Sequence, residues 1–209
     1  IGASVYAYRT NFNNRLQQVT SGPSVNPIST VANVGGVTMN GVDAAITIMP
    51  IKNLSFTNSV SYNHATYDND LVESGIPYPT RGKQIINYPR FMYKTRLSYD
   101  WKGLTAYVDA SYTGKRNYSY IGDVKVPSYW MTNLGVQYNL AKLPAFKKSV
   151  DFVQDLTLNL SVTNIQNTRY IATMGENGNP LSISKGAMEF QSMLVGAPRM
   201  FFGSISTNF

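Results

Sequence analysis

The chain has 209 residues and carries few charges for its size. Asp, Glu, Lys and Arg make up 14% of it and the formal net charge is +7, whereas an average soluble domain holds about 25% charged residues. No apolar run approaches the roughly 20 residues that a membrane-spanning helix needs, which excludes a helical membrane protein. Cysteine is absent, which excludes disulfides, thiolate zinc sites and cysteine nucleophiles.

Tyrosine is unusually common, with 15 residues, and aromatic residues reach 12% of the chain. Together with abundant Ser, Thr and Asn, this composition suits a transmembrane β-barrel, which needs apolar side chains only at alternate positions. A soluble β-sandwich or a β-propeller fragment explains the composition equally well. The basic residues are scattered, with tight pairs only at Lys115–Arg116 and Lys147–Lys148, so we expect no nucleic-acid partner.

Alternation of apolar and polar residues dominates the chain from residue 34 onward and predicts an all-β, antiparallel fold. The predicted strands reach or exceed the roughly 9–11 residues that cross an outer membrane at a tilt. The eight predicted strands are residues 2–19, 33–49, 53–67, 89–101, 104–114, 125–141, 155–167 and 198–209.

The predicted connections alternate between short and long. Short turns lie at 50–53 and 102–103, and long polar loops lie at 20–32, 68–88, 115–124 and 168–197. Outer-membrane barrels have short periplasmic turns and long outer loops, and an even number of strands leaves both termini on the periplasmic side. The connection at 142–154 is an exception, since it falls on the short side but is long.

Residues 53–70 hold the residues that most resemble a catalytic or metal site. His64 is the only histidine in the chain, so a catalytic dyad or a zinc site lacks partners, and we expect an ordinary interfacial side chain and no enzyme activity. Asp68 and Asp70 do not have the spacing of a calcium loop. We therefore expect a solvated loop, no metal and no cofactor.

The strand at 89–101 argues for a membrane. Its odd positions are aromatic at both ends and include Leu97 near the middle, while its even positions include Lys94 and Arg96. Aromatic girdles bracket the lipid band of a transmembrane barrel in this way. A soluble adhesin-like β-protein does not explain these aromatic ends.

Three stretches together resemble TonB-dependent outer-membrane receptors. Residues 34–48 (VGGVTMNGVDAAITI) resemble a Gly-rich approach to a long strand with an acidic step at Asp43, which we expect to face the lumen. Residues 164–170 (NIQNTRY) resemble the family element that closes the penultimate strand, through Asn164, Asn167 and Tyr170, with Ile165 in place of the usual leucine. The ending FFGSISTNF resembles an assembly signal for exported barrels; its predicted residues are Phe201, Ile205 and Phe209.

This resemblance covers nearly the whole chain and implies the C-terminal part, residues 1–209, of a barrel of about 22 strands with a plugged lumen. The plug domain, the N-terminal barrel strands and the segment that contacts TonB would be missing. The implied function is uptake of a scarce nutrient, such as a ferric siderophore, across the bacterial outer membrane. The implied partners are outer-membrane lipid, lipopolysaccharide, the barrel-assembly machinery, TonB and a small-molecule ligand. Lys94 and Arg96 are expected to pair with acidic groups of the plug or of neighbouring strands.

Aromatic and basic residues gather in the predicted outer loops. Tyrosine packs on flat ligand surfaces while offering a hydroxyl, and arginine pairs with anionic groups. An iron chelate would suit such a surface. Membership of the outer aromatic girdle or contact with lipopolysaccharide phosphates is the interpretation that we favour. The candidate ligand-binding residues are Tyr78, Arg81, Arg116, Tyr118 and Tyr120.

One rival architecture remains open from the sequence. Eight strands can close on themselves into a complete small barrel, porin-like or structural, with an interior just filled by side chains. Several predicted lumen positions are small, including Ser55, Thr57, Ser59 and Ser61, and such residues fill a narrow interior poorly. Pairing between the first and last strands would indicate the small barrel, whereas unpaired edges would indicate a missing remainder.

Overall fold

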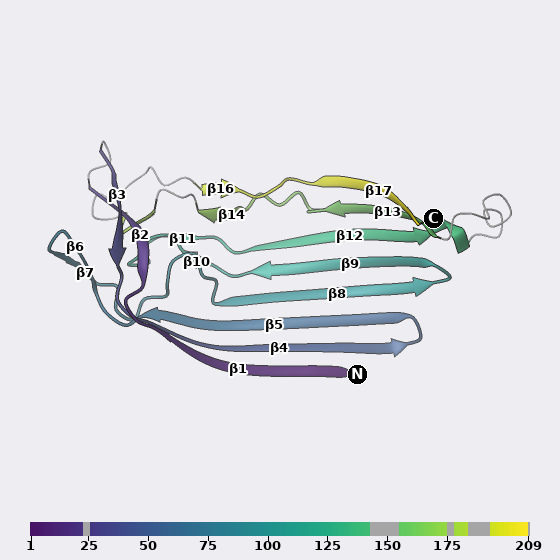
Figure 1. Cartoon of the computed structure of the whole chain (residues 1–209), viewed down its shortest axis with the longest axis horizontal. Helices are drawn as coiled ribbons and strands as arrows, with labels where there is room; N and C mark the ends of the chain where they lie inside the picture. The colour runs from purple at the N-terminus through teal and green to yellow at the C-terminus, as the bar shows by residue number, and fades with distance from the viewer. Residues whose placement is uncertain (23–25, 143–154, 175–177, 184–192, 209) are drawn as a thin grey trace.

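The computed structural model describes residues 1–22, 26–142, 155–174, 178–183 and 193–208. Eight long antiparallel strands form one sheet in the order β1-β4-β5-β8-β9-β12-β13-β17, drawn side by side in Figure 1. The strands of this sheet are β1 (Gly2–Phe12), β4 (Val37–Ile51), β5 (Leu54–Tyr67), β8 (Phe91–Trp101), β9 (Leu104–Thr113), β12 (Tyr129–Asn139), β13 (Asp155–Thr163) and β17 (Met200–Asn208). We call this sheet the wall.

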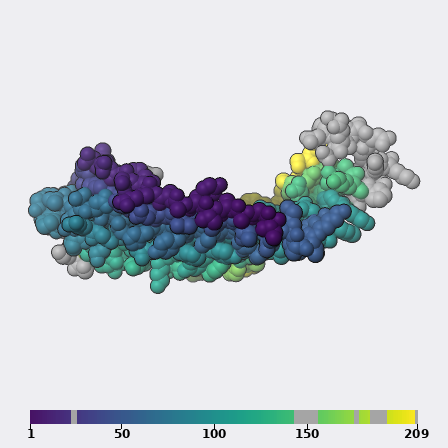
Figure 2. Space-filling model, turned by 90° about the horizontal axis from the view of Figure 1, so that it is seen from below, coloured from purple at the N-terminus to yellow at the C-terminus, as the bar shows by residue number. Residues whose placement is uncertain are grey.

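The wall is a single curved layer whose two edges stay open. In the described part of the chain, β1 pairs only with β4 and β17 pairs only with β13. Figure 2 shows β1 along one edge of the slab, with no second layer over it. Because the first and last strands do not pair, the complete eight-stranded barrel is not favoured.

The wall strands are joined by short turns at one end, where the backbone takes left-handed conformations. Lys102 and Gly103 have φ values of 47° and 91°, as a two-residue hairpin turn of the primed type requires. Lys52 and Asn53 join β4 to β5, and Asn53 has a φ of 70°. Leu140–Lys142 forms a short 3-10 helix, and the rest of the predicted long connection, 143–154, lies outside the described residues.

The two faces of the wall differ as the alternation predicts. Cross-strand partners share a face, and the register places Leu97, Val108 and Leu134 in one row of the apolar face. The opposite face carries Lys94, Arg96 and Asp109. Leu134 is 45% exposed, so the apolar face is open to its surroundings.

Tyrosine rings cover glycines on neighbouring strands. Tyr8 lies opposite Gly41, and a Cβ added to Gly41 would come within 2.3 Å of the Tyr8 ring. Tyr107 covers Gly135 in the same way, at 2.2 Å. Aromatic rings that cover strand glycines restore packing where no side chain stands.

The predicted loops contain short strands of their own at the other end of the wall (Figure 1). These strands are β2 (Leu16–Ser21), β3 (Ile28–Asn33), β6 (Leu71–Glu73), β7 (Ile76–Tyr78), β10 (Arg116–Asn117), β11 (Lys125–Val126), β14 (Ile171–Met174), β15 (Asn179–Pro180) and β16 (Met193–Val195). They form four small sheets. No helix among the described residues is long and apolar enough to cross a membrane.

Four predicted strands end or begin at the wrong place. The strand predicted from residue 33 begins at Val37, because Asn33 belongs to β3. The strand predicted at 2–19 stops at Phe12, and Leu16–Ser21 pairs with Ile28–Asn33 in a separate hairpin. The strand predicted from 125 begins at Tyr129, because Lys125–Val126 pairs back to β10. The strand predicted to 167 ends at Thr163, where Asn164 takes a φ of 51°.

Candidate functional site

The buried core of the described chain lies among the loops rather than in the wall. Its largest fully buried side chains include Tyr67, Tyr120, Leu71 and Leu181. The core also contains Val19, Val34, Val37, Ala65, Ile85 and Ile86. We call this assembly of loops the loop cluster; it forms because each loop contributes apolar residues that its own short strands cannot bury.

Tyr120, a predicted ligand-binding residue, lies at the centre of the loop cluster. It is fully buried, its hydroxyl donates to the carbonyl of Gln18 at 3.0 Å, and its ring lies 5.7 Å from that of Tyr67. Burial raises the pKa of the Tyr120 phenol because the charged form would lose its hydration. In this arrangement Tyr120 joins two loops and presents no surface to a ligand.

Arg116 is also buried, with 5% of its surface exposed. Its guanidinium donates to the Asn87 side chain at 3.0 Å, to the Ala172 carbonyl at 3.0 Å and to the Ile171 carbonyl at 2.5 Å. Burial lowers the pKa of this guanidinium. Arg116 therefore ties three loops together through neutral acceptors.

Tyr118 packs in a second small core with Val126 and Met174. Only 3% of its surface is exposed, and burial raises the pKa of its phenol. Tyr118 lies in the same connection between β9 and β12 as Arg116 and Tyr120, and all three side chains are buried there.

Tyr78 and Arg81 are the accessible members of the predicted group. Tyr78 is half-buried against the loop core at the end of β7. Arg81 is exposed, and its backbone amide donates to Asp70 Oδ1 at 2.9 Å. Among the described residues, no group of three or more His, Cys, Asp or Glu side chains could hold a metal ion.

The element Asn164–Tyr170 forms a tight connection after β13. The Asn164 amide group donates to the carbonyls of Thr168 and Ala197, each at 3.0 Å, and its Oδ1 accepts from the Thr168 amide at 2.8 Å. Asn167 Oδ1 accepts from the Arg199 amide at 3.0 Å. The Tyr170 ring stacks on Tyr129 with 4.4 Å between centroids. These contacts hold the approach to the last strand.

Two of the predicted assembly residues, Phe201 and Ile205, lie on the apolar face of β17. Phe201 pairs with Val162 and Ile205 pairs with Leu158, and both are strongly exposed, at 73% and 68%. Phe209 lies outside the described residues.

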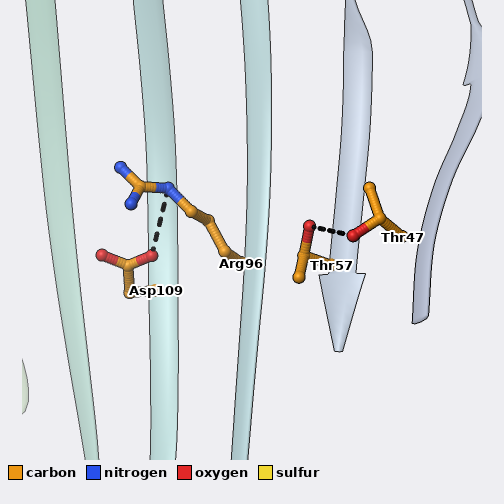
Figure 3. A network of polar contacts seen from close by, with 4 residues as sticks. All are labelled: Thr47, Thr57, Arg96 and Asp109. Atoms are coloured by element: carbon orange, nitrogen blue, oxygen red, sulfur yellow. Dashed lines mark hydrogen bonds and ion pairs between the residues drawn. The ribbon is translucent and has the colours of Figure 1, made fainter. Parts of the chain in front are cut away.

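The polar face carries a charged group at mid-wall, shown in Figure 3. Arg96 Nε lies 3.5 Å from Asp109 Oδ1, and the Arg96 guanidinium carbon lies 4.1 Å from the centre of the Tyr107 ring. Thr47 and Thr57 share a hydrogen bond of 3.0 Å on the same face. Arg96 thus pairs with a neighbouring strand, as expected.

Two other polar-face residues lack such a partner. Within the described residues Lys94 forms no ion pair, although it lines an open polar hollow of about 360 Å³ with Arg96 and Asp109. Asp43 lies opposite Ser61 on this face, half-buried.

Comparison with known protein families identifies the family to which this chain belongs. The family model "TonB dependent receptor-like, beta-barrel" matches residues 1–165. The chain belongs to this family. The family consists of bacterial outer-membrane receptors rather than enzymes, so the apolar face of the wall is lipid-facing and the polar face is lumenal.

Solved structures share this fold at low identity. The siderophore receptor PiuA from Acinetobacter baumannii is 17% identical, with a TM-score of 0.66 over 97% of this chain and 25% of its own. The ferric yersiniabactin uptake receptor FyuA from Yersinia pestis is 11% identical, with a TM-score of 0.67 over 99% and 28%. The copper transporter OprC is 12% identical, with a TM-score of 0.69 over 97% and 29%.

The chain therefore spans about a quarter of the length of these solved relatives. Among curated proteins, no sequence matches. Because one of the structures is named as a copper transporter and others as siderophore receptors, the shared fold does not identify a ligand.

Proposed function

We propose that this chain is the C-terminal part of a TonB-dependent transporter that takes up a scarce nutrient, such as a ferric siderophore, across the outer membrane. The observation that carries the proposal is the open wall with a lipid-facing apolar side and a polar lumen side, in a chain of the receptor family. The remaining strands of a barrel of about 22 and a plug domain would stand before residue 1.

The two ends of the wall support an orientation. The loop cluster at one end would face outside and the short turns at the other would face the periplasm, which puts the C-terminus in the periplasm. Phe201, Ile205 and Phe209 would then present an assembly signal to the barrel-assembly machinery. TonB would act through the missing N-terminal part, and we propose neither an enzymatic activity nor a nucleic-acid partner.

The five predicted ligand-binding residues would have two different roles in the loop cluster, one at its surface and one in its interior. Tyr78 and Arg81 would reach a small-molecule ligand, because they are accessible on the loop surface. Arg116, Tyr118 and Tyr120 would act beneath them, since they are buried and join the loops that carry the surface. Asp43 would meet the plug on the lumen side.

Uptake by the complete receptor tests the proposal. A strain lacking the gene is complemented with the wild-type or Arg81→Gln receptor and grown under iron limitation on a panel of ferric chelates, with copper as a separate arm. We expect one chelate class to restore growth only when TonB is present, and Arg81→Gln to weaken its binding about tenfold. Growth that is independent of both the receptor and TonB in every arm would contradict the proposal.

A further inference from the structure

The hairpin of β2 and β3 ends in a strand edge that no other strand covers. Its sheet has the order β15-β2-β3, and in the described part of the chain β3 pairs only with β2. The outer edge of a sheet presents a row of N–H and C=O groups that can pair with another chain. We call the free side of Ile28–Asn33 the β3 edge.

The hydrogen bonds of the hairpin show which backbone groups point outward. The Val34 amide donates to the Arg15 carbonyl at 2.9 Å, and bonded and unbonded pairs alternate along an antiparallel ladder. Gln18 and Val31 face each other three positions further along, so they form an unbonded pair. The N–H and C=O of Val31 therefore point away from β2, and they form no hydrogen bond within the described residues.

The other edge of the same hairpin already holds an extended segment. β15 comes from a distant loop and lies parallel to β2, with Asn179 opposite Val19 and Pro180 opposite Thr20. Both residues of β15 are buried. The hairpin thus takes up an extended chain by backbone pairing on one side, while the same kind of pairing is still open on the other.

The β3 edge lacks the features that usually protect an exposed edge. Natural sheets block such edges with charged residues, proline or bulges. The sequence has no charged residue between Arg15 and Asp43, Ile28–Asn33 contains no proline, and its register with β2 has no bulge. The carboxylate of Glu73 accepts from Thr30 Oγ1 at 3.4 Å, on the side of the hairpin that faces the core.

The β3 edge faces away from the wall. Figure 1 shows β2 and β3 crossing the direction of the wall strands, with β3 farther from the wall than β2. With the orientation given under the proposed function, this edge faces the outside medium. A second receptor in the same membrane would present its edge in the same direction, so two copies could not pair edge to edge.

The side chains around the β3 edge indicate what kind of chain fits. Leu16 and Val31 lie on the same face of the hairpin and are 68% and 70% exposed. A strand added to the edge would place every second side chain on that face. The matching ligand is therefore an uncharged peptide with apolar residues at alternate positions.

We propose that the β3 edge binds an extended, uncharged peptide ligand from outside the cell by strand addition. Backbone hydrogen bonds to Val31 and its alternate neighbours would supply the affinity, and contacts with Val31 and Leu16 would supply the preference for apolar side chains. The proposal rests on the outward orientation of the loop cluster and adds a peptide site to the receptor.

Peptide binding to the complete receptor tests the site. The probe is the acetylated and amidated peptide GTVTVTG, titrated against the purified receptor in detergent by isothermal calorimetry. Val31→Pro removes the outward N–H but leaves the pairing with β2, because proline is tolerated on the free side of an edge strand. It should weaken binding at least about tenfold. Val31→Thr keeps the N–H and the branched shape and should stay within about twofold of wild type.

A second probe separates backbone pairing from contact through side chains. The fully N-methylated peptide has the same side chains but no N–H groups, and it should bind at least about tenfold more weakly than the unmodified peptide. Equal binding of the two peptides would overturn the proposal, and so would equal binding of the unmodified peptide by wild type and Val31→Pro.

Hydrogen exchange shows what fills the β3 edge. Without peptide the Val31 amide should exchange fast, and saturating peptide should slow it at least about tenfold. A Val31 amide that is already protected would overturn the proposal, because another segment of the complete receptor would then occupy the edge. Unchanged protection of the Val19 amide in Val31→Pro shows that the hairpin is still folded.

The failure of this proposal can be told apart from failure of the proposed function. Val31→Pro that takes up nutrient, yet binds the peptide like wild type, contradicts only the β3 edge. Biotin-labelled peptide added to intact cells tests the orientation, and we expect it to label cells that carry the wild-type receptor. Binding to the purified receptor but not to intact cells would contradict the outward orientation and overturn a ligand from outside.

Discussion

The wall and the loop cluster are built on opposite principles. In the wall, large apolar side chains such as Val5 and Ile205 are 70% and 68% exposed, and neighbouring strands hold together through their backbone ladders. In the loop cluster, Tyr120 and Val19 are fully buried. The wall depends on lipid and on the lumen to cover its faces, whereas the loop cluster carries its own core.

The difference predicts that each region tolerates what would damage the other. A loss of volume matters most in the loop cluster, where no solvent or lipid refills the space. A gain of charge matters most on the lipid-facing wall, where water is absent. Four predictions test this contrast.

The largest effect is expected at the centre of the loop cluster. Tyr120→Ala should lower the free energy of opening of the loop cluster by about 3–5 kcal/mol, because it leaves a cavity beside Tyr67. Hydrogen exchange of the Val19 and Leu181 amides in the complete receptor measures it. Val31→Ala, at a side chain 70% exposed on β3, is the control and should change little. Equal loss of protection in β8 and β9 would show that the two regions are not separate.

The next effect is expected on the lipid-facing wall. Leu134 lies midway between Trp130 and Tyr138 on β12, and Leu134→Arg should destabilise the barrel by about 2–4 kcal/mol. Gln137→Arg, on the lumen face of the same strand, should cost far less because water reaches it. Equilibrium unfolding of both variants provides the comparison, and equal costs would mean that the faces are wrongly assigned.

A smaller effect is expected where tyrosine covers glycine. Gly135→Ala would bring a Cβ within 2.2 Å of the Tyr107 ring and should cost about 1–3 kcal/mol. Gly203→Ala meets only Leu160, at 3.4 Å, and should be nearly neutral. The double variant with Tyr107→Ala should remove the clash. Equal unfolding free energies for the two glycine variants would argue against this packing.

The smallest effect is a pH dependence of the loop cluster. Burial raises the pKa of the Tyr118 and Tyr120 phenols above 10.0, so the closed cluster holds the proton more tightly than the opened one. Stability from this source is present below about pH 10 and falls as the pH rises further. Tyr120→Phe should lower it by about 0.5–1.5 kcal/mol through the lost bond to Gln18 and make the alkaline decline shallower.

Limited proteolysis of the loops between about pH 8 and about pH 11 follows this decline. The wall strands should resist the protease throughout. A decline of equal steepness in wild type and Tyr120→Phe would exclude Tyr120 as a source of the pH dependence.

The wall could be predicted from the sequence because each strand shows its own alternation of apolar and polar residues. In β8 the aromatic ends and the alternation of Leu97 with Arg96 fix the strand, its two faces and its place in a membrane. The sequence predicted an acidic partner for Arg96, but it left open whether that partner lies on a neighbouring strand, as Asp109 does, or on a plug. Errors arose where alternation continued through a bend, as between Phe12 and Leu16.

The loop cluster could not be predicted because its contacts join distant segments. β15 pairs with β2 across about 160 residues of sequence, and no local period signals such a pair. The same limit explains Tyr118 and Tyr120: composition drew attention to them as aromatic loop residues, but only the fold shows that they are buried.

Disulfide trapping across the edges of the wall tests the central claim most directly. The chain has no cysteine, so pairs can be introduced on the lumen face without a background from this region. Asn159→Cys with Ser204→Cys joins register partners on β13 and β17 and should cross-link in the complete receptor. Ser4→Cys with Ser204→Cys joins the two open edges and should not. A cross-link between β1 and β17 as efficient as the first pair would show a closed eight-stranded barrel and contradict the account.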